Sequence, residues 1–157
     1  MAEGVSEVLI PVVLMANGLA AGVLMGTQLG GWPLLESLPQ GRYVQAHAFL
    51  STRYDPFMPI CFAVTAVGDG VLAGLADDAG TATLFGTAAL LTLSTVVVSL
   101  AKNVPVNKWL RTLDPDHLPV DFAERDPRRH WGSWNWTRTA LAALALLANC
   151  VAVGLTL

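Results

Sequence analysis

The chain has 157 residues, of which 54% are hydrophobic and 13% are charged, whereas soluble domains carry about 25% charged residues. This composition excludes an ordinary soluble domain. The formal net charge of −3 comes with no separate basic patch, so nothing indicates nucleic-acid binding and we expect no nucleic-acid partner.

Four apolar runs predict the fold class. Each run is close to the roughly 20 residues that a helix needs to cross about 30 Å of hydrocarbon. Helices are the only spanning structure that fits this length and pattern. We therefore predict an all-α fold, a four-helix transmembrane bundle with short interfacial helices in its two cytoplasmic connections. The whole chain, 1–157, forms a single membrane domain with spans at about 8–29, 56–76, 81–101 and 138–157.

The basic residues predict the orientation. All nine Lys and Arg residues lie in two segments, Arg42 to Arg53 and Lys102 to Arg138. The positive-inside rule places such segments in the cytoplasm. We expect a multi-pass protein of the cell membrane with both termini outside.

The first span carries a glycine at every fourth position, Gly18, Gly22 and Gly26. Such a stripe lets another helix approach closely and allows a homo-oligomer to form through it. Gln28 lies near the inner end of this span, and the segment from Trp32 to Gln40 is expected to be a loop because of its prolines.

The first connection continues with a predicted helix from Gly41 to Arg53, which has His47 in its middle. Tyr54 and Asp55 follow, and Pro56 and Pro59 suit the entry of the second span. Because this helix lies at the cytoplasmic face, His47 is placed to fold over the ends of the spans.

The part of the bundle in the outer half of the bilayer is predicted to hold a polar layer. Counting about 1.5 Å per residue places one polar side chain from each span at a similar depth; these are Asn17, Asp69, Thr92 and Asn149. The layer is either hydrogen-bonding glue between helices or the lining of a cavity or proton path at Asp69.

The third span ends at Lys102-Asn-Val-Pro-Val-Asn107. Asn103 and Asn107 are four residues apart and share a helical face. Pro105 suits the first turn of a new helix, so we expect the span to end here and a short surface helix to follow. The two amides either cap these helices or bind a ligand.

The fourth span opens with Trp131-x-x-Trp134-Asn135-x-x-Arg138. Trp131, Trp134 and Arg138 fall on one helical face with Asn135 beside it. An interfacial aromatic belt and a snorkelling arginine would also explain these residues.

The polar ends of all four spans converge at the cytoplasmic side, and this convergence is the candidate site. The candidate catalytic residues are His47, Asp55, Asn103, Asn107, Asn135 and Arg138. The candidate substrate-binding residues are Gln28, Tyr54 and Trp134.

The two motifs around Asn103–Asn107 and Trp131–Arg138 together resemble the anthrone oxygenase-like (DUF1772) integral membrane proteins, and the resemblance covers nearly the whole chain. It implies a small four-helix membrane protein. Some members oxygenate anthrones to anthraquinones with molecular oxygen in secondary metabolite biosynthesis. The resemblance therefore implies a membrane oxidase or monooxygenase with a hydrophobic small-molecule substrate.

Such a reaction needs a base for an acidic C–H proton and donors for the resulting enolate oxygen. His47 or Asp55 is the candidate base, and Arg138 with the asparagines the candidate donor set. Tyr54 and Trp134 could stack on a flat substrate.

The sequence requires no cofactor. A mononuclear copper or iron site is the alternative, with His47 as the first candidate ligand and Asp55, Asp69 or His130 beside it. A second alternative is a non-enzymatic membrane subunit, such as an assembly partner or a small transporter component.

Overall fold

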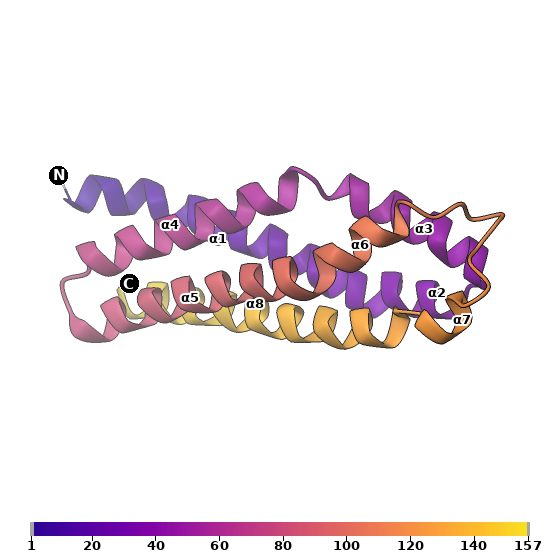
Figure 1. Ribbon diagram of the computed structural model, residues 1–157. Helices are drawn as coiled ribbons and strands as arrows, with labels where there is room; N and C mark the ends of the chain where they lie inside the picture. Colours follow the sequence, from indigo (N-terminus) through magenta and orange to yellow (C-terminus); the bar gives the residue numbers. More distant parts are fainter. Residues whose placement is uncertain (1, 157) are drawn as a thin grey trace.

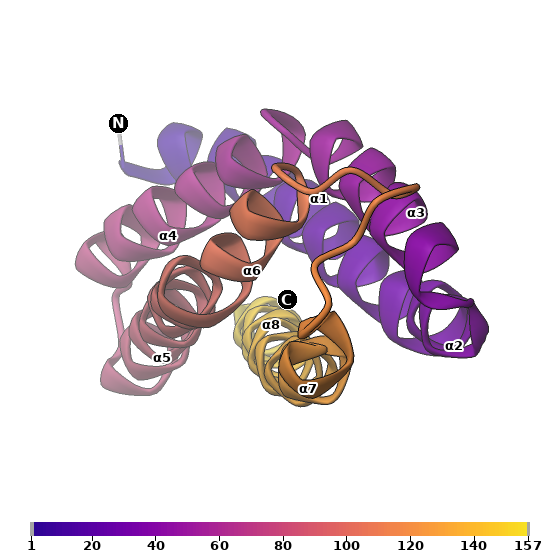
Figure 2. The ribbon, with the colours of Figure 1, turned by 45° about the vertical axis from the view of Figure 1, so that its right-hand side comes forward.

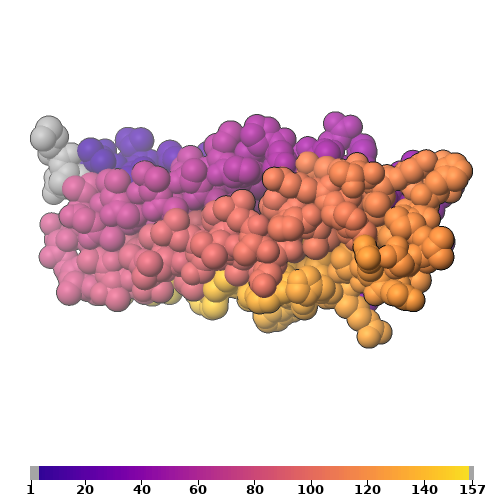
Figure 3. Space-filling view, in the orientation of Figure 1, coloured from indigo at the N-terminus to yellow at the C-terminus, as the bar shows by residue number. Residues whose placement is uncertain are grey.

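The computed structural model describes residues 2–156 and confirms the predicted all-α bundle. The described part contains no strand, and its elements form an elongated rod (Figures 1 and 3). Four of its helices are long and apolar enough to cross a membrane, namely Gly4–Ser37, Phe57–Leu75, Ala79–Leu110 and Phe122–Leu155.

The long helices are divided by short irregular turns. In chain order, the elements are α1 (Ala2–Gly26), the π-helical turn η1 (Thr27–Gly31), α2 (Trp32–Ser37), α3 (Gln40–Arg53), α4 (Phe57–Leu75), α5 (Ala79–Val98), the π-helical turn η2 (Ser99–Asn103), α6 (Val104–Leu110), α7 (Phe122–Arg125) and α8 (Arg128–Thr156). The start of α1 and the end of α8 lie at the same end of the bundle (Figure 1).

Two helices continue past the residues at which the sequence predicts that they end. The first runs on into α2, where the sequence predicts a loop, and the third runs on into α6. Each passes through a π-helical turn, and a proline follows two residues later, Pro33 after η1 and Pro105 after η2. A proline ring clashes with the carbonyl four residues before it, and a π turn widens the helix there. The prolines therefore modify these helices without ending them.

Small side chains fill the membrane part of the bundle. Ala16, Ala20, Ala142 and Ala145 are all at most 7% exposed, which lets the helices approach closely. α1 and α5 each pack against both α4 and α8. The four helices therefore form a ring in which α4 and α8 stand opposite each other.

The predicted polar layer lies inside this ring. Asp69 on α4 accepts a hydrogen bond from Asn149 on α8 at 3.3 Å between Nδ2 and Oδ2. Asn17 on α1 and Thr92 on α5 are buried in the other two helices. The bond joins opposite helices, so it supports the reading of Asp69 and Asn149 as interhelical glue.

The glycine stripe of α1 faces outward. A Cβ atom added at Gly18, Gly22 or Gly26 would have nothing within 4 Å. The stripe does not pack against another helix in the described part of the chain, and its use in a homo-oligomer stays a prediction.

The end of the bundle opposite the termini carries a second core. This end is the basic end, because the two segments that hold all nine Lys and Arg residues meet there. α2, α3, α6 and α7 gather around the start of α8 in Figure 2. Their shared core consists of Leu35, Tyr43, Val44, Leu110 and Phe122.

Two contacts fix this second core to α8. The guanidinium of Arg128 donates to the carbonyl of Leu38 at 2.7 Å, and its carbon lies 4.7 Å from the centre of the Tyr43 ring. Gly132 permits the close approach of Trp32, because a Cβ atom there would lie 2.5 Å from the indole ring. The basic end is therefore held in a defined position over the bundle.

Candidate functional site

A cavity of about 540 Å³ extends from the basic end into the bundle. The lining side chains come from α4, from the continuous helix formed by α5, η2 and α6, and from α1, α3 and α8. Most of the lining side chains are apolar, and the polar ones gather at the basic end. Small-molecule sites commonly have this size and this composition.

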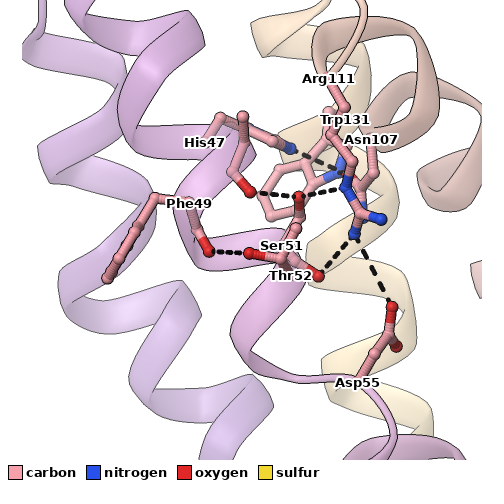
Figure 4. Close-up of polar contacts among 9 residues, drawn as sticks. His47, Phe49, Ser51, Thr52, Asp55, Asn107, Arg111 and Trp131 are labelled. Atoms are coloured by element: carbon pink, nitrogen blue, oxygen red, sulfur yellow. Dashed lines mark hydrogen bonds and ion pairs between the residues drawn. The ribbon is translucent and has the colours of Figure 1, made fainter.

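Three side chains from three elements meet at the polar end of the cavity. The Nε2 atom of His47 on α3 lies 2.9 Å from Oδ1 of Asn107 on α6. The indole Nε1 of Trp131 on α8 donates to the same oxygen at 2.8 Å. The His47 and Trp131 rings are also in edge contact, with centroids 4.7 Å apart. Figure 4 shows these three residues converging.

This arrangement determines the tautomer of His47. An indole N–H can only donate a hydrogen bond, so the Asn107 atom that it contacts is the carbonyl oxygen. The Nε2 atom of His47 contacts the same oxygen, so it must also donate. Neutral His47 therefore carries its proton on Nε2 and a lone pair on Nδ1. Nδ1 is buried and has no hydrogen-bond partner in the described part of the chain.

The charge state of His47 follows from its surroundings. Burial lowers its pKa, the hydrogen bond to Asn107 partly opposes this shift, and the positive charges of Arg138 and Arg111 lower the pKa further. His47 is only 2% exposed. Since its pKa lies below the ordinary value of 6.5, the ring is neutral at pH 7.

The second half of the Asn107 amide remains available. Its Oδ1 accepts from both His47 and Trp131, whereas no hydrogen bond of its Nδ2 occurs among the described residues. Asn107 lines the cavity. The two ring donors thus fix the orientation of the amide and leave its N–H donors for a ligand.

Arg138 lines the same cavity and is held by neutral groups. Its Nε and one terminal nitrogen donate to Oδ1 of Asn135 at 3.0 and 2.8 Å, and the other terminal nitrogen lies 3.5 Å from Oγ of Ser99. Its guanidinium carbon lies 5.6 Å from the centre of the Trp131 ring. No ion pair joins Arg138 to a carboxylate within residues 2–156.

Three predicted site residues contact the cavity-lining residues from outside the cavity. Asn135 is fully buried and donates through Nδ2 to Oε1 of Gln28 at 2.8 Å, which joins α8 to the turn η1. Asn103 is also fully buried and donates to the carbonyl of Trp131 at 3.2 Å. Gln28, Asn103 and Asn135 therefore position cavity residues and do not line the cavity themselves.

A cation–carboxylate pair lies at the rim of the cavity. Arg111, directly after α6, donates to the carbonyl of Ser51 at 2.7 Å and to its hydroxyl at 3.1 Å, and it lies 3.7 Å from a carboxylate oxygen of Asp55 (Figure 4). The Asp55 side chain is 62% exposed. The contacts join the end of α3 to α6, and the ion pair itself adds little stability because it is exposed.

The two remaining predicted residues, Tyr54 and Trp134, differ in their relation to the cavity. Tyr54 lines the cavity, as expected of a substrate-binding residue. Trp134 does not line it, because its ring lies against Lys102, 5.0 Å from Nζ, and against His130.

The candidate metal ligands are not brought together. Asp55 lies at the rim, Asp69 is bonded to Asn149 inside the bundle, and His130 is exposed beside Trp134. Across the described residues, no group of three or more His, Cys, Asp or Glu side chains could hold a metal ion. Within residues 2–156, the candidate carboxylates and His130 therefore do not join His47 in a metal site.

The structure adds residues to the candidate site predicted from the sequence. Trp131 is 4% exposed and contacts His47, Asn107 and Arg138, so it is a central part of the site. The spacing of Trp131, Asn135 and Arg138 at i, i+4 and i+7 is the signal that could have identified it. Ser51 and Arg111 carry no comparable signal.

The sequence of the chain matches the model of a known protein family. A family model described as anthrone oxygenase matches residues 48–148, well over half of the chain. The chain belongs to the anthrone oxygenase family. The resemblance inferred from the sequence motifs is thereby confirmed. No curated protein and no solved structure matches the chain.

The part that matches the anthrone oxygenase family contains most of the site. It includes Tyr54, Asp55, Asn107, Trp131 and Arg138 and begins one residue after His47. At the coarse level of the family description, the activity is that of an oxygenase.

Proposed function

We propose that this protein is a membrane-embedded oxygenase that uses molecular oxygen on an electron-rich, apolar small molecule of the anthrone-like class. The reaction takes place in the cavity at the basic end. The observation that carries the proposal is Arg138, a cation that lines an apolar cavity without a carboxylate partner in the described structure. A buried cation of this kind suits an anionic ligand.

The anion that fits is the enolate of a ketone with an acidic C–H bond. Its charge develops on oxygen as the proton leaves, and donors fixed in advance around that oxygen stabilise the transition state. The guanidinium of Arg138 and the Nδ2 donors of Asn107 are held by neighbouring side chains, so little reorganisation is needed. Tyr54 and Trp131 supply aromatic contacts to a flat ring system.

We assign proton acceptance to Asp55 and positioning to His47. The Asp55 carboxylate is exposed at the cavity rim, whereas Nδ1 of His47 is buried and Nε2 donates to Asn107. An aspartate serves as the base for a ketone C–H proton in ketosteroid isomerase. His47 acts by fixing the amide of Asn107.

The chemistry balances with oxygen as the only oxidant. The base removes one C–H proton, and the electron-rich carbon bonds to O₂ to give a peroxide anion. The protonated base returns its proton to form the hydroperoxide, which loses water as its remaining C–H bond and its O–O bond break. A CH₂ group and O₂ thus become a ketone and one molecule of water. No reductant is consumed.

The test is oxygen uptake and anthraquinone formation by the protein in lipid vesicles with anthrone as the probe, after subtraction of the rate in empty vesicles. We expect Arg138→Gln to lower turnover by about 10²–10³-fold, the usual cost of one donor to a developing oxyanion. Arg129→Gln is the matched control, because Arg129 is an exposed arginine on the same helix.

Two results would contradict the proposal. Equal turnover in Arg138→Gln and Arg129→Gln would remove the chemistry from this cavity. No uptake above empty vesicles, with the protein folded, would favour the alternative of a non-enzymatic membrane subunit.

A further inference from the structure

Several residues line the cavity and are also exposed on the outside of the bundle. On α4 these are Pro59, Ala63 and Val67, spaced four residues apart, and Val67 is 68% exposed. Facing them are Leu93 on α5 and Leu100 in η2, at 49% and 62% exposure. Side chains around a closed cavity would be covered by their neighbours. The cavity therefore opens sideways between α4 and α5.

This opening lies within the apolar part of the bundle. Val67 is ten residues from the start of α4, which is about 15 Å along the helix. The neighbouring exposed side chains are also apolar, including Ile60, Leu90 and Val97. Figure 3 shows this face, with α4 in magenta above α5 in pink and orange. The surface around the opening is therefore suited to contact with lipid acyl chains.

The cavity has opposite characters at its two ends. The α4–α5 opening is apolar, whereas His47, Asn107 and Arg138 lie at the basic end. A ligand entering from the side would advance with its polar group first and keep its apolar body between the two helices. The lining thus matches a molecule with a hydrophobic ring body and one ionisable oxygen.

We infer that the substrate enters laterally from the bilayer through the opening between α4 and α5, so that the substrate class is a lipid-soluble ring ketone that need not pass through water. This inference rests on the proposed function in one respect, namely that the molecule bound in the cavity is the substrate of the oxygenase. The route itself follows from the exposure of the lining residues.

The test uses benzophenone dissolved in vesicles that contain the full-length protein. Benzophenone is an apolar two-ring ketone that inserts into C–H bonds on irradiation and favours methionine. Met58 lines the cavity and is 8% exposed, whereas Met15 is 63% exposed on α1 and serves as the internal reference for lipid contact. After a brief irradiation, mass spectrometry compares the labelling of the two methionines.

We expect benzophenone to label both Met58 and Met15. Ala63→Trp and Leu100→Trp, which place an indole in the opening, should remove most labelling of Met58 and leave that of Met15 unchanged. The matched controls are Ile60→Trp and Val97→Trp, because these residues are exposed on the same two helices but do not line the cavity. The Met15 signal also shows that each variant has inserted.

Charged 4-benzoylbenzoate supplied from water tests the other route. We expect it to leave Met58 unlabelled. Labelling of Met58 by the charged reagent alone would overturn the inference. An equal loss of Met58 labelling by benzophenone in Ile60→Trp and Ala63→Trp would overturn it as well. Lateral labelling of Met58 without oxygen uptake on anthrone would retain the route and contradict the proposed oxygenase, so the two failures are distinguishable.

Discussion

His47 and Trp131 donate hydrogen bonds to the same oxygen atom, Oδ1 of Asn107, at 2.9 and 2.8 Å. The two rings come from helices that are far apart in the sequence, and they fix one amide between them. This shared acceptor determines the tautomer of His47 and the direction of the Asn107 donors. It is therefore the structural basis of the polar end of the cavity.

Replacement of the shared acceptor should be costly. Asn107→Leu leaves the Nε1 donor of Trp131 and the Nε2 donor of His47 without a partner, and each unsatisfied buried donor costs about 1–3 kcal/mol. The free energy of unfolding in detergent micelles should fall accordingly. Asn107→Asp retains an acceptor and is the control; equal losses in both variants would contradict the shared hydrogen bond.

The stability of the protein should depend on pH through His47. Because burial lowers the pKa of His47 below 6.5 in the folded state, the unfolded chain binds a proton at this site before the folded chain does. The free energy of unfolding should therefore fall as the pH decreases below 6.5, by up to about 1.4 kcal/mol per pH unit. Below the pKa of His47 in the folded state, the free energy of unfolding no longer falls through this residue. Well above pH 6.5, His47 does not contribute to the pH dependence of the free energy of unfolding.

The control for this pH dependence is His47→Gln, which can retain a donor to Asn107 but does not titrate. Its unfolding free energy should lack the His47 contribution below pH 6.5, while the exposed His117 and His130 remain in both proteins. An identical pH dependence of the two proteins would contradict a buried, neutral His47.

Asn135 should act through Arg138. Asn135→Leu removes the oxygen that accepts two guanidinium N–H groups, and misplacement of a positioning group can lower turnover by on the order of 100-fold. Gln28→Leu removes only the contact behind Asn135, so its effect on anthrone turnover should be smaller. A larger loss in Gln28→Leu would show that Arg138 is not positioned in this way.

Gly132→Ala should disturb the aromatic contact beside the site. The added methyl would lie within 3 Å of three Trp32 ring atoms, and overpacking of this kind costs about 1–3 kcal/mol. Trp32 packs on Trp131 with centroids 5.8 Å apart, so tryptophan fluorescence should also change. Gly154→Ala is the control on the same helix, because its Cβ would meet nothing within 4 Å.

The sequence predicts which polar and aromatic side chains lie at the basic end, but it does not predict which of them point toward the cavity. Trp134 and Asn135 are neighbours on α8, yet Asn135 is fully buried and Trp134 lies outside the cavity against Lys102. From helical spacing alone, either Trp134 or Asn135 could face inward together with Trp131 and Arg138. The rotation of α8 decides between them, and the close approach of Gly132 to Trp32 contributes to that rotation.

The prolines show a related limit. The sequence predicts that the helices end near Pro33 and Pro105, whereas both prolines follow π-helical turns inside helices that continue. A proline signals a local change of hydrogen bonding, but whether the helix stops depends on what the next turn packs against. Here Leu35 and Leu110 of the continuing turns are buried in the core of the basic end.

The sequence by itself determined the four apolar spans, the segregation of basic residues to one end, and the motifs that mark the anthrone oxygenase family. The spans and the segregation of charge follow from composition and from the fixed rise of the helix, whereas the family was identified by the resemblance of its motifs. Only the tertiary structure decided that Trp131 is central, that Asn107 is oriented by two rings, and that the cavity opens between α4 and α5. These properties depend on how far each helix is rotated and bent against its neighbours, which a one-dimensional period does not specify.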